Sequence, residues 1–157
     1  MISRNLFFII NNNSKFSFRD KIVYSTEVKI RVRYSETDQM GYCYYGNYAQ
    51  YFEVARVEML RGLGISYREM EKEGILLPVT DYSIKFIKPA YYDEKLTIQT
   101  FIRILPNIRI SFDYETYNES GEKINEASTR LVFLDSKNKR PTRAPQTLID
   151  QLNGYFT

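Results

Sequence analysis

Apolar residues alternate with charged residues near the start of the chain, and their spacing then changes. The alternation covers residues 28–34 and has the period of a strand with one buried face. From Tyr48 to Leu63 the apolar residues recur every three or four positions, as on one face of an amphipathic helix. Asn47 stands where a helix cap is expected, and glycines follow the apolar stripe. The pattern predicts a strand, a loop and a long helix.

A second, shorter helix and four strands are predicted for the rest of the chain. Ser66 and Glu69 have the spacing of a capping box, and Gly74 closes this helix. Four alternating segments follow, separated by turns rich in proline, asparagine and glycine, at residues 82–86, 96–104, 108–114 and 127–133. Their short connections favour antiparallel neighbours. Packing the long helix on the apolar face of this sheet buries both, so the predicted fold class is α+β.

Composition limits the chain to one domain of ordinary size. Its 157 residues suffice for one core, and 43% hydrophobic residues exclude a disordered class. The net charge of +3, from 22 basic and 19 acidic residues, is too even to predict a nucleic-acid partner. Cys43 is the single cysteine, which excludes an intrachain disulfide and suits a cytoplasmic location.

The first residues of the chain follow neither pattern. The apolar run Leu6–Ile10 has only five residues, fewer than the roughly 7–15 of a signal-peptide core. No other stretch approaches the ~20 apolar residues of a membrane span. We expect residues 1–25 to form a poorly ordered or peripheral leader, and residues 26–157 to form a single domain.

The loop between the first strand and the long helix is the expected place for chemistry. Asp38 lies there, close in sequence to glycine-bearing loop amides and to the start of the helix. The chain has no histidine, so a carboxylate is the leading candidate for a base. An aspartate after a strand is also a common turn former, and residue chemistry alone favours that interpretation. Cys43 lacks a histidine partner and is expected to be an inert small hydrophobe.

Two contiguous blocks around Asp38 carry a resemblance to a known family. The blocks read Tyr34-x-x-x-Asp38-x-x-Gly41 and Asn47-Tyr48-x-x-Tyr51-Phe52-Glu53-x-Ala55-Arg56. They resemble the signature of the hotdog-fold acyl-CoA thioesterases, the group of 4-hydroxybenzoyl-CoA thioesterase and YbgC-like enzymes. Two later blocks, residues 85–90 and 140–145, resemble the family's central strand boundary and C-terminal end. The likeness spans roughly residues 26–152.

The resemblance implies a hotdog fold, in which a curved antiparallel sheet wraps around one long central helix. It also implies hydrolysis of an acyl-CoA thioester to the free acid and CoA, with Asp38 as general base or nucleophile. The backbone amides of Tyr45 and Gly46 are expected to form the oxyanion hole. Many YbgC-like members carry histidine where this chain has Tyr45, whereas the hydroxybenzoyl type has tyrosine there.

The same resemblance implies homodimers or homotetramers, with active sites at the dimer interface. Coenzyme A is part of the substrate, so no cofactor is expected. No metal is expected either, because the acidic residues have no histidine or cysteine beside them in a ligand pattern.

Further residues are candidates for binding the substrate, and each has a structural alternative. Tyr34 is placed to orient Asp38 through its hydroxyl or to pack in the core. Asn47 is a substrate ligand or a helix cap. Arg109 matches a phosphate-binding place of the hydroxybenzoyl type. The wall of the acyl pocket, or simply the core, is predicted to include Leu77, Pro78 and Val79.

Other functions stay open from the sequence alone. A ligand- or RNA-binding sheet would use tyrosines to stack on bases, but no RNP-like motif is present. A hotdog protein that binds acyl-CoA without hydrolysing it, or one that acts on acyl carrier protein, fits the same residues.

Overall fold

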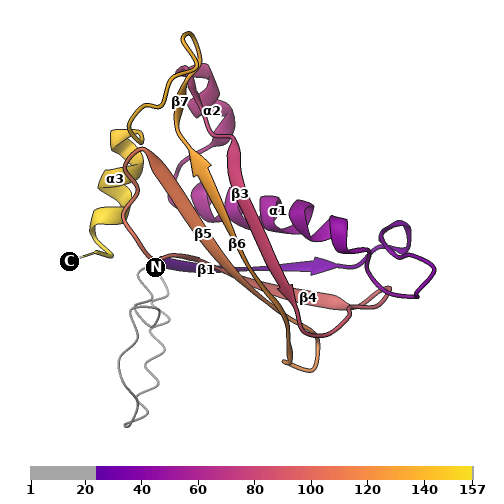
Figure 1. The fold of residues 1–157 in the computed structure, drawn as a ribbon. Coiled ribbons are helices and arrows are strands. Elements are labelled where there is room, and N and C mark those ends of the chain that lie inside the picture. Colours follow the sequence, from indigo (N-terminus) through magenta and orange to yellow (C-terminus); the bar gives the residue numbers. More distant parts are fainter. Residues whose placement is uncertain (1–23, 157) are drawn as a thin grey trace.

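A five-stranded antiparallel sheet packs against one long helix in the computed structural model, which describes residues 24–156 (Figure 1). The strands lie in the order β1-β4-β5-β6-β3. Their bounds are Tyr24–Arg31 for β1, Val79–Phe86 for β3, Lys95–Ile102 for β4, Arg109–Tyr117 for β5 and Lys123–Val132 for β6. The long helix α1 runs from Tyr48 to Gly62. The predicted α+β class and the hotdog arrangement of sheet and central helix are confirmed.

Shorter elements complete the chain. They are the 3₁₀ turns η2 (Tyr34–Glu36) and η3 (Tyr45–Asn47), the helices α2 (Tyr67–Lys72) and α3 (Gln146–Asn153), and the paired strands β2 (Ile75–Leu76) and β7 (Leu134–Asp135). The short helix predicted after α1 is confirmed as α2. The sequence analysis did not predict α3 or the small β2–β7 sheet.

The core lies between α1 and the inner face of the sheet. The predicted stripe of α1 is buried as expected, and its fully covered members include Phe52, Ala55 and Met59. The ring of Phe52 stacks on Tyr114 of β5, with ring centroids 4.4 Å apart. Full burial of one such side chain stabilises the fold by roughly 1.5–3 kcal/mol. Packing on the sheet therefore fixes the position of α1, and with it the loop that precedes the helix.

The first strand differs from its prediction at both ends. It begins at Tyr24, two residues inside the predicted leader, and it ends at Arg31 rather than Tyr34. The chain then turns because the Glu36 amide donates to the Arg33 carbonyl at 3.0 Å. Tyr34 is consequently 77% exposed, so the expectation that it packs in the core is wrong. The rest of the predicted leader, residues 1–23, lies outside the described residues.

Two predicted helix caps do not form. Asn47 and Ser66 stand at the N-cap positions of α1 and α2, but neither side chain makes a capping hydrogen bond. The Asn47 amide group is engaged elsewhere, because its Nδ2 donates to the Glu36 carbonyl at 2.7 Å. The η3 turn leads directly into α1 and supplies part of the backbone bonding that a cap would otherwise provide.

Among residues 24–156, neither edge strand of the sheet has a partner on its outer side. The strand β3 pairs only with β6, and seven of its eight residues are exposed. At the opposite edge, β1 pairs only with β4. Within residues 24–156, no helix has the length and apolar character needed to cross a membrane.

Candidate active site

Asp38 opens a tight hairpin between η2 and η3. Thr37 and Cys43 face each other in an antiparallel bridge, and the Asp38 amide donates to the Tyr42 carbonyl at 3.1 Å. Gly41 closes the turn with a φ of +83°, a conformation that side chains disfavour. The Asp38 Oδ1 accepts a hydrogen bond from the Met40 amide at 2.9 Å. Asp38 therefore is a turn former, while its second carboxylate oxygen has no hydrogen-bond donor among residues 24–156.

The backbone just before α1 offers two free donors. Neither the Tyr45 amide nor the Gly46 amide donates to an acceptor within the described part of the chain. Both belong to η3, whose last residue adjoins the first residue of the 15-residue helix α1. The N-terminus of such a helix carries partial positive charge. The local backbone thus has the donors that stabilise a developing oxyanion.

The space above Gly46 is occupied by an aromatic ring. A Cβ added there would lie 2.6 Å from Cε1 of Tyr44, closer than real atoms approach. The Tyr44 ring in turn packs against Tyr45, with centroids 4.5 Å apart. Packing against the Tyr44 ring within the chain therefore requires glycine at this position.

A hollow of about 450 Å³ joins the Asp38 loop to the end of β3. Its lining residues come from the hairpin, from the start of α1 and from the segment after β3; they are Asp38, Met40, Tyr42, Cys43, Tyr45, Tyr48, Phe86, Ile87, Lys88 and Pro89. The walls are mostly aromatic or aliphatic, with one carboxylate and one ammonium. This combination is typical of small-molecule sites. The Lys88 ammonium is paired with the Glu122 carboxylate.

All the predicted site residues except Tyr34 fall into two groups. The hairpin and η3 bring together Asp38, Tyr45, Gly46 and Asn47. The other group comprises Leu77, Pro78, Val79 and Arg109, which lie at the far end of the sheet. The register shows this separation, because Val79 pairs with Leu131 whereas Phe86 pairs with Asn125. Strands rise by about 3.4 Å per residue, so the length of β3 separates the two groups.

The second group shares one corner of the sheet. Arg109 pairs with Val132, whose amide donates to the Pro78 carbonyl at 3.1 Å. Leu77 packs against the core, as its structural alternative proposed. Val79 is exposed on the edge strand. Within one chain, these residues are too distant from Asp38 to complete its site.

Tyr34 does not reach Asp38 in this structure. Its ring meets Tyr92 edge-on, with centroids 5.4 Å apart, and no hydrogen bond joins its hydroxyl to the described residues. Cys43 is buried, and burial is the main reason that the pKa of its thiol is raised. A thiol that resists ionisation is a poor nucleophile, which agrees with the inert role predicted from the sequence.

Glu36, a buried acid two residues before Asp38, was not among the predicted site residues. Only 6% of its surface is exposed, and it accepts hydrogen bonds from Tyr51 and from Arg33. Burial alone raises a carboxyl pKa, but the Tyr51 bond and the Arg33 contacts outweigh it, so the pKa of Glu36 is lowered. The i, i+3 spacing of Arg33 and Glu36 was the available signal.

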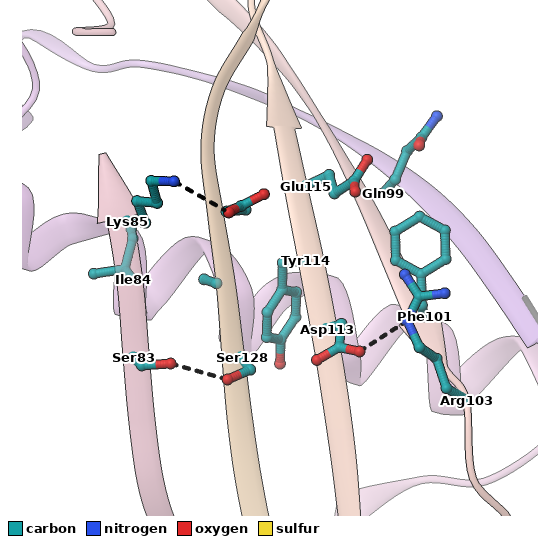
Figure 2. Close-up of a pocket in the computed structure, with 12 residues that line it drawn as sticks. Ser83, Ile84, Lys85, Gln99, Phe101, Arg103, Asp113, Tyr114, Glu115 and Ser128 are labelled. Carbon is teal, nitrogen blue, oxygen red and sulfur yellow. Dashed lines mark hydrogen bonds and ion pairs between the residues drawn. The ribbon is translucent and has the colours of Figure 1, made fainter. Parts of the chain in front are cut away.

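A larger hollow, about 710 Å³, lies on the outer face of the sheet (Figure 2). It holds none of the predicted site residues. Its charged groups are mostly paired with each other, as in the contacts of Arg103 with Asp113 at 2.9 Å and of Lys85 with Glu126 at 3.9 Å. The smaller hollow, which is lined by Asp38 and Tyr45, is therefore the candidate active site.

Comparison with known proteins identifies the family of the chain. Residues 32–152 match the family model of the thioesterase-like superfamily. YneP of Bacillus subtilis is 35% identical over 127 residues, covering 81% of this chain and 92% of that protein. The acyl-CoA thioester hydrolase YbgC of Escherichia coli is 29% identical over 120 residues, covering 76% of this chain and 90% of that protein.

A solved structure gives the same result. A DHNA-CoA thioesterase from Staphylococcus aureus superposes with a TM-score of 0.77 at 38% identity, covering 84% of this chain and 89% of that one. The family model covers the Asp38 hairpin, α1 and the strands β3 to β6, and β1 precedes its first residue. The chain therefore belongs to the thioesterase-like superfamily and is a hotdog-fold thioesterase.

Proposed function

We propose that this thioesterase hydrolyses acyl-CoA thioesters to the free acid and CoA, with Asp38 as general base or nucleophile. One observation carries the assignment of residues. Asp38 lines an apolar hollow together with Tyr45, whose amide and that of Gly46 have no acceptor within residues 24–156. The similarity to YbgC, an acyl-CoA thioester hydrolase, and to the Staphylococcus DHNA-CoA thioesterase supports the substrate class.

The reaction needs a nucleophile and a way to stabilise negative charge. Asp38 either deprotonates a water that attacks the thioester carbonyl, or attacks the carbonyl itself to give an anhydride that water then hydrolyses. In both routes a C–O bond forms, the C–S bond breaks, and the CoA sulfur leaves as a thiolate that takes up a proton. The amides of Tyr45 and Gly46 would donate to the carbonyl oxygen as it becomes negative. No cofactor takes part, because CoA belongs to the substrate.

The proposed active unit contains more than one copy of the chain. The edge strand β3 exposes Val79, Tyr82 and Phe86, so it offers both unpaired backbone groups and apolar side chains. If two copies pair antiparallel along β3, the start of one β3 meets the end of the other. The partner's Leu77, Pro78 and Val79 would then line the acyl pocket, and the partner's Arg109 would contact CoA phosphates. A homodimer of this kind, or a homotetramer of two dimers, is the proposed assembly, and the cytoplasm is its proposed location.

The first experiment measures thiol release from short, long and aromatic acyl-CoAs by the wild-type chain and by Asp38→Asn. Asparagine keeps an oxygen for the Met40 amide, so the hairpin should persist. We expect the substitution to lower kcat by about 10²–10⁴-fold. Binding of CoA, measured by calorimetry, should change little, because the carboxylate acts on the thioester and not on the nucleotide.

Asp135→Asn is the matched control. Asp135 also accepts backbone amides in a turn, from Lys137 at 2.8 Å and Asn138 at 3.1 Å, but it does not line the hollow. Its kcat should equal that of the wild type. Wild-type turnover in Asp38→Asn would contradict the assignment of Asp38. Inactivity of the wild-type chain on every acyl-CoA, with activity on acyl carrier protein or with binding alone, would contradict the substrate class.

A further inference from the structure

Glu36 holds a buried carboxylate beneath the Asp38 hairpin, and four donors surround it. Its Oε2 accepts from the Tyr51 hydroxyl at 2.5 Å and from the Arg33 amide at 2.8 Å. Its Oε1 accepts from the Arg33 Nε at 3.0 Å and forms an ion pair with Nη2 of the same guanidinium at 2.9 Å. Hydrogen bonds to a charged group are stronger than those between neutral groups. The carboxylate therefore joins the end of β1 to the first turns of α1.

The backbone carbonyl of Glu36 accepts hydrogen bonds from the loop on both sides of the free amides. It accepts from the Tyr44 amide at 2.9 Å and from the Asn47 Nδ2 at 2.7 Å. Tyr45 and Gly46 lie between these two donors in the chain. Glu36 thus fixes the backbone before and after the two amides that are free to donate.

Glu36 is also linked to Asp38 through the backbone. Thr37 separates the two acids, and both its amide and its hydroxyl donate to the Tyr34 carbonyl, at 3.2 Å and 2.8 Å. Thr37, which these two bonds hold in place, is the only residue between Glu36 and Asp38. A shift of Glu36 would therefore move the Asp38 carboxylate relative to the amides of Tyr45 and Gly46.

We propose that Glu36 is a positioning residue, which sets the distance between the Asp38 carboxylate and the amides of Tyr45 and Gly46. The proposal rests on the function proposed above for those three residues. Hydrolysis requires the attacking oxygen and the oxyanion donors to meet the same thioester carbonyl, and small displacements of such groups are costly. Glu36 does not line the hollow and has no contact with a substrate placed there.

A purely structural role for Glu36 makes a different prediction. Removing a buried, hydrogen-bonded charge destabilises a protein wherever it lies. If stability were the only effect, the folded fraction of a Glu36 variant would turn over substrate at the wild-type rate. A positioning role lowers kcat of the folded enzyme while substrate binding stays the same.

The test is Glu36→Gln in the full-length chain, assayed with the acyl-CoA that the wild type hydrolyses fastest. Glutamine keeps the size of the side chain, but its amide nitrogen opposes the donors of Arg33. We expect kcat to fall by about 10–100-fold. The affinity for a non-hydrolysable thioether analogue of the same acyl-CoA should stay within about twofold of the wild type. Urea unfolding establishes that the assayed enzyme is folded.

Glu115→Gln is the matched control. Glu115 also accepts from a tyrosine hydroxyl, that of Tyr117 at 2.6 Å, and pairs with the Lys123 ammonium at 3.0 Å. It lies on β5 and lines the hollow on the outer face of the sheet. Its kcat should equal that of the wild type, even where its stability falls.

The outcomes separate this proposal from the one on which it rests. Wild-type kcat in folded Glu36→Gln, together with an inactive Asp38→Asn, overturns the positioning role alone. Full activity in Asp38→Asn overturns the proposed function instead. If Glu36→Gln does not fold, Tyr51→Phe decides the matter, because it removes one donor and leaves the Arg33 contacts. We expect its kcat to fall about three- to tenfold, and an unchanged kcat would overturn the proposal.

Discussion

At the scale of single residues, Gly46 is the position where the smallest change should have the largest effect. An alanine Cβ there would come within 2.6 Å of Cε1 of Tyr44, so the ring or the η3 turn must move. Either movement disturbs the amides of Tyr45 and Gly46. We expect Gly46→Ala to lower kcat by about tenfold or more, with a modest loss of stability. Steady-state thiol release and thermal unfolding measure the two effects.

Gly154→Ala is the control for that substitution. Gly154 follows α3 with an ordinary φ of −62°, and an added Cβ would meet no atom within 4 Å. It should leave kcat unchanged. Equal kcat for the two alanine variants would mean that the Tyr44 ring yields without disturbing the donors.

Glu36 also predicts a pH dependence of stability. Its pKa in the folded state lies below the ordinary value of 4.5. Burial opposes this shift, but the bonds from Tyr51 and Arg33 exceed it. A lowered carboxyl pKa stabilises the folded state above the unfolded pKa, and this stability is lost as pH falls through the folded pKa. The difference in unfolding free energy between wild type and Glu36→Gln should therefore be constant above about pH 5.5 and shrink below pH 4.5.

Urea titrations at pH 7, 5 and 3.5 measure that difference. Glu122→Gln allows the buried carboxylate of Glu36 to be compared with an exposed one, because Glu122 pairs with Lys88 at the surface. A difference between wild type and Glu36→Gln that stays the same down to pH 3.5 would contradict the assignment of a charged, buried Glu36.

Single residues of the site were predictable where their position along the chain was enough. Asp38, Tyr45 and Gly46 lie in one continuous segment, so the sequence motif proposed them together, and the structure brings Asp38 and Tyr45 to the same hollow. Tyr34 was predicted to be buried because the alternation continues through it, but the Arg33–Glu36 contact turns the chain first. Glu36 was missed because its role depends on Tyr51, which meets it only after α1 has packed on the sheet.

At the scale of elements, a buried cation joins the two consecutive helices. Arg56 of α1 is 8% exposed, and its Nε donates to the Tyr67 hydroxyl of α2 at 3.3 Å. No carboxylate pairs with it within residues 24–156. Tyr67→Phe removes one of the two tyrosine hydroxyls that accept from this cation, the other being that of Tyr114, so the free energy of unfolding should fall by about 1–3 kcal/mol.

Tyr91→Phe provides the comparison in urea unfolding. Tyr91 is exposed, and its hydroxyl has no hydrogen bond to the described residues. Its substitution should change stability by less than about 0.5 kcal/mol. Similar losses for the two variants would show that Arg56 keeps its stabilising contacts without the Tyr67 hydroxyl.

Helices and strands with a long pattern of apolar residues were predicted better than short ones. The stripe of α1 repeats over four turns, and its extent agrees with the prediction within one residue. The strands β2 and β7 have two residues each, and they pair across a separation of almost sixty residues. No local sequence pattern predicts such a pair. The helix α3 has a short stripe, Leu148 and Leu152, which was present in the sequence but too brief to separate from a turn-rich end.

At the scale of the whole molecule, the open edge at β3 predicts an assembly that can be measured. Val79 is exposed at the start of this strand. Val79→Lys places a charge where two copies are proposed to meet. Light scattering should show a shift of the wild-type oligomer toward the monomer, and kcat should fall in parallel, because the partner's corner is proposed to complete the site.

Ser25→Lys adds the same charge to the other edge strand, β1, where Ser25 is also exposed. Its molecular mass and kcat should match those of the wild type. A monomeric wild type with full activity would contradict the proposed shared site. So would a monomeric Val79→Lys variant that keeps its full kcat.

The contrast between the two sheet edges also limits how far the assembly can grow. The exposed positions of β1 include Glu27, Lys29 and Arg31, a run of charges that opposes pairing with another strand. Pairing of β1 with the β3 of a second copy would leave a free edge at each end and would propagate into a filament. Pairing of two copies through β3 alone is two-fold symmetric, and it leaves neither copy with an unpaired β3 edge. The charges on β1 therefore disfavour fibre growth, whereas the proposed pairing through β3 would give a closed dimer.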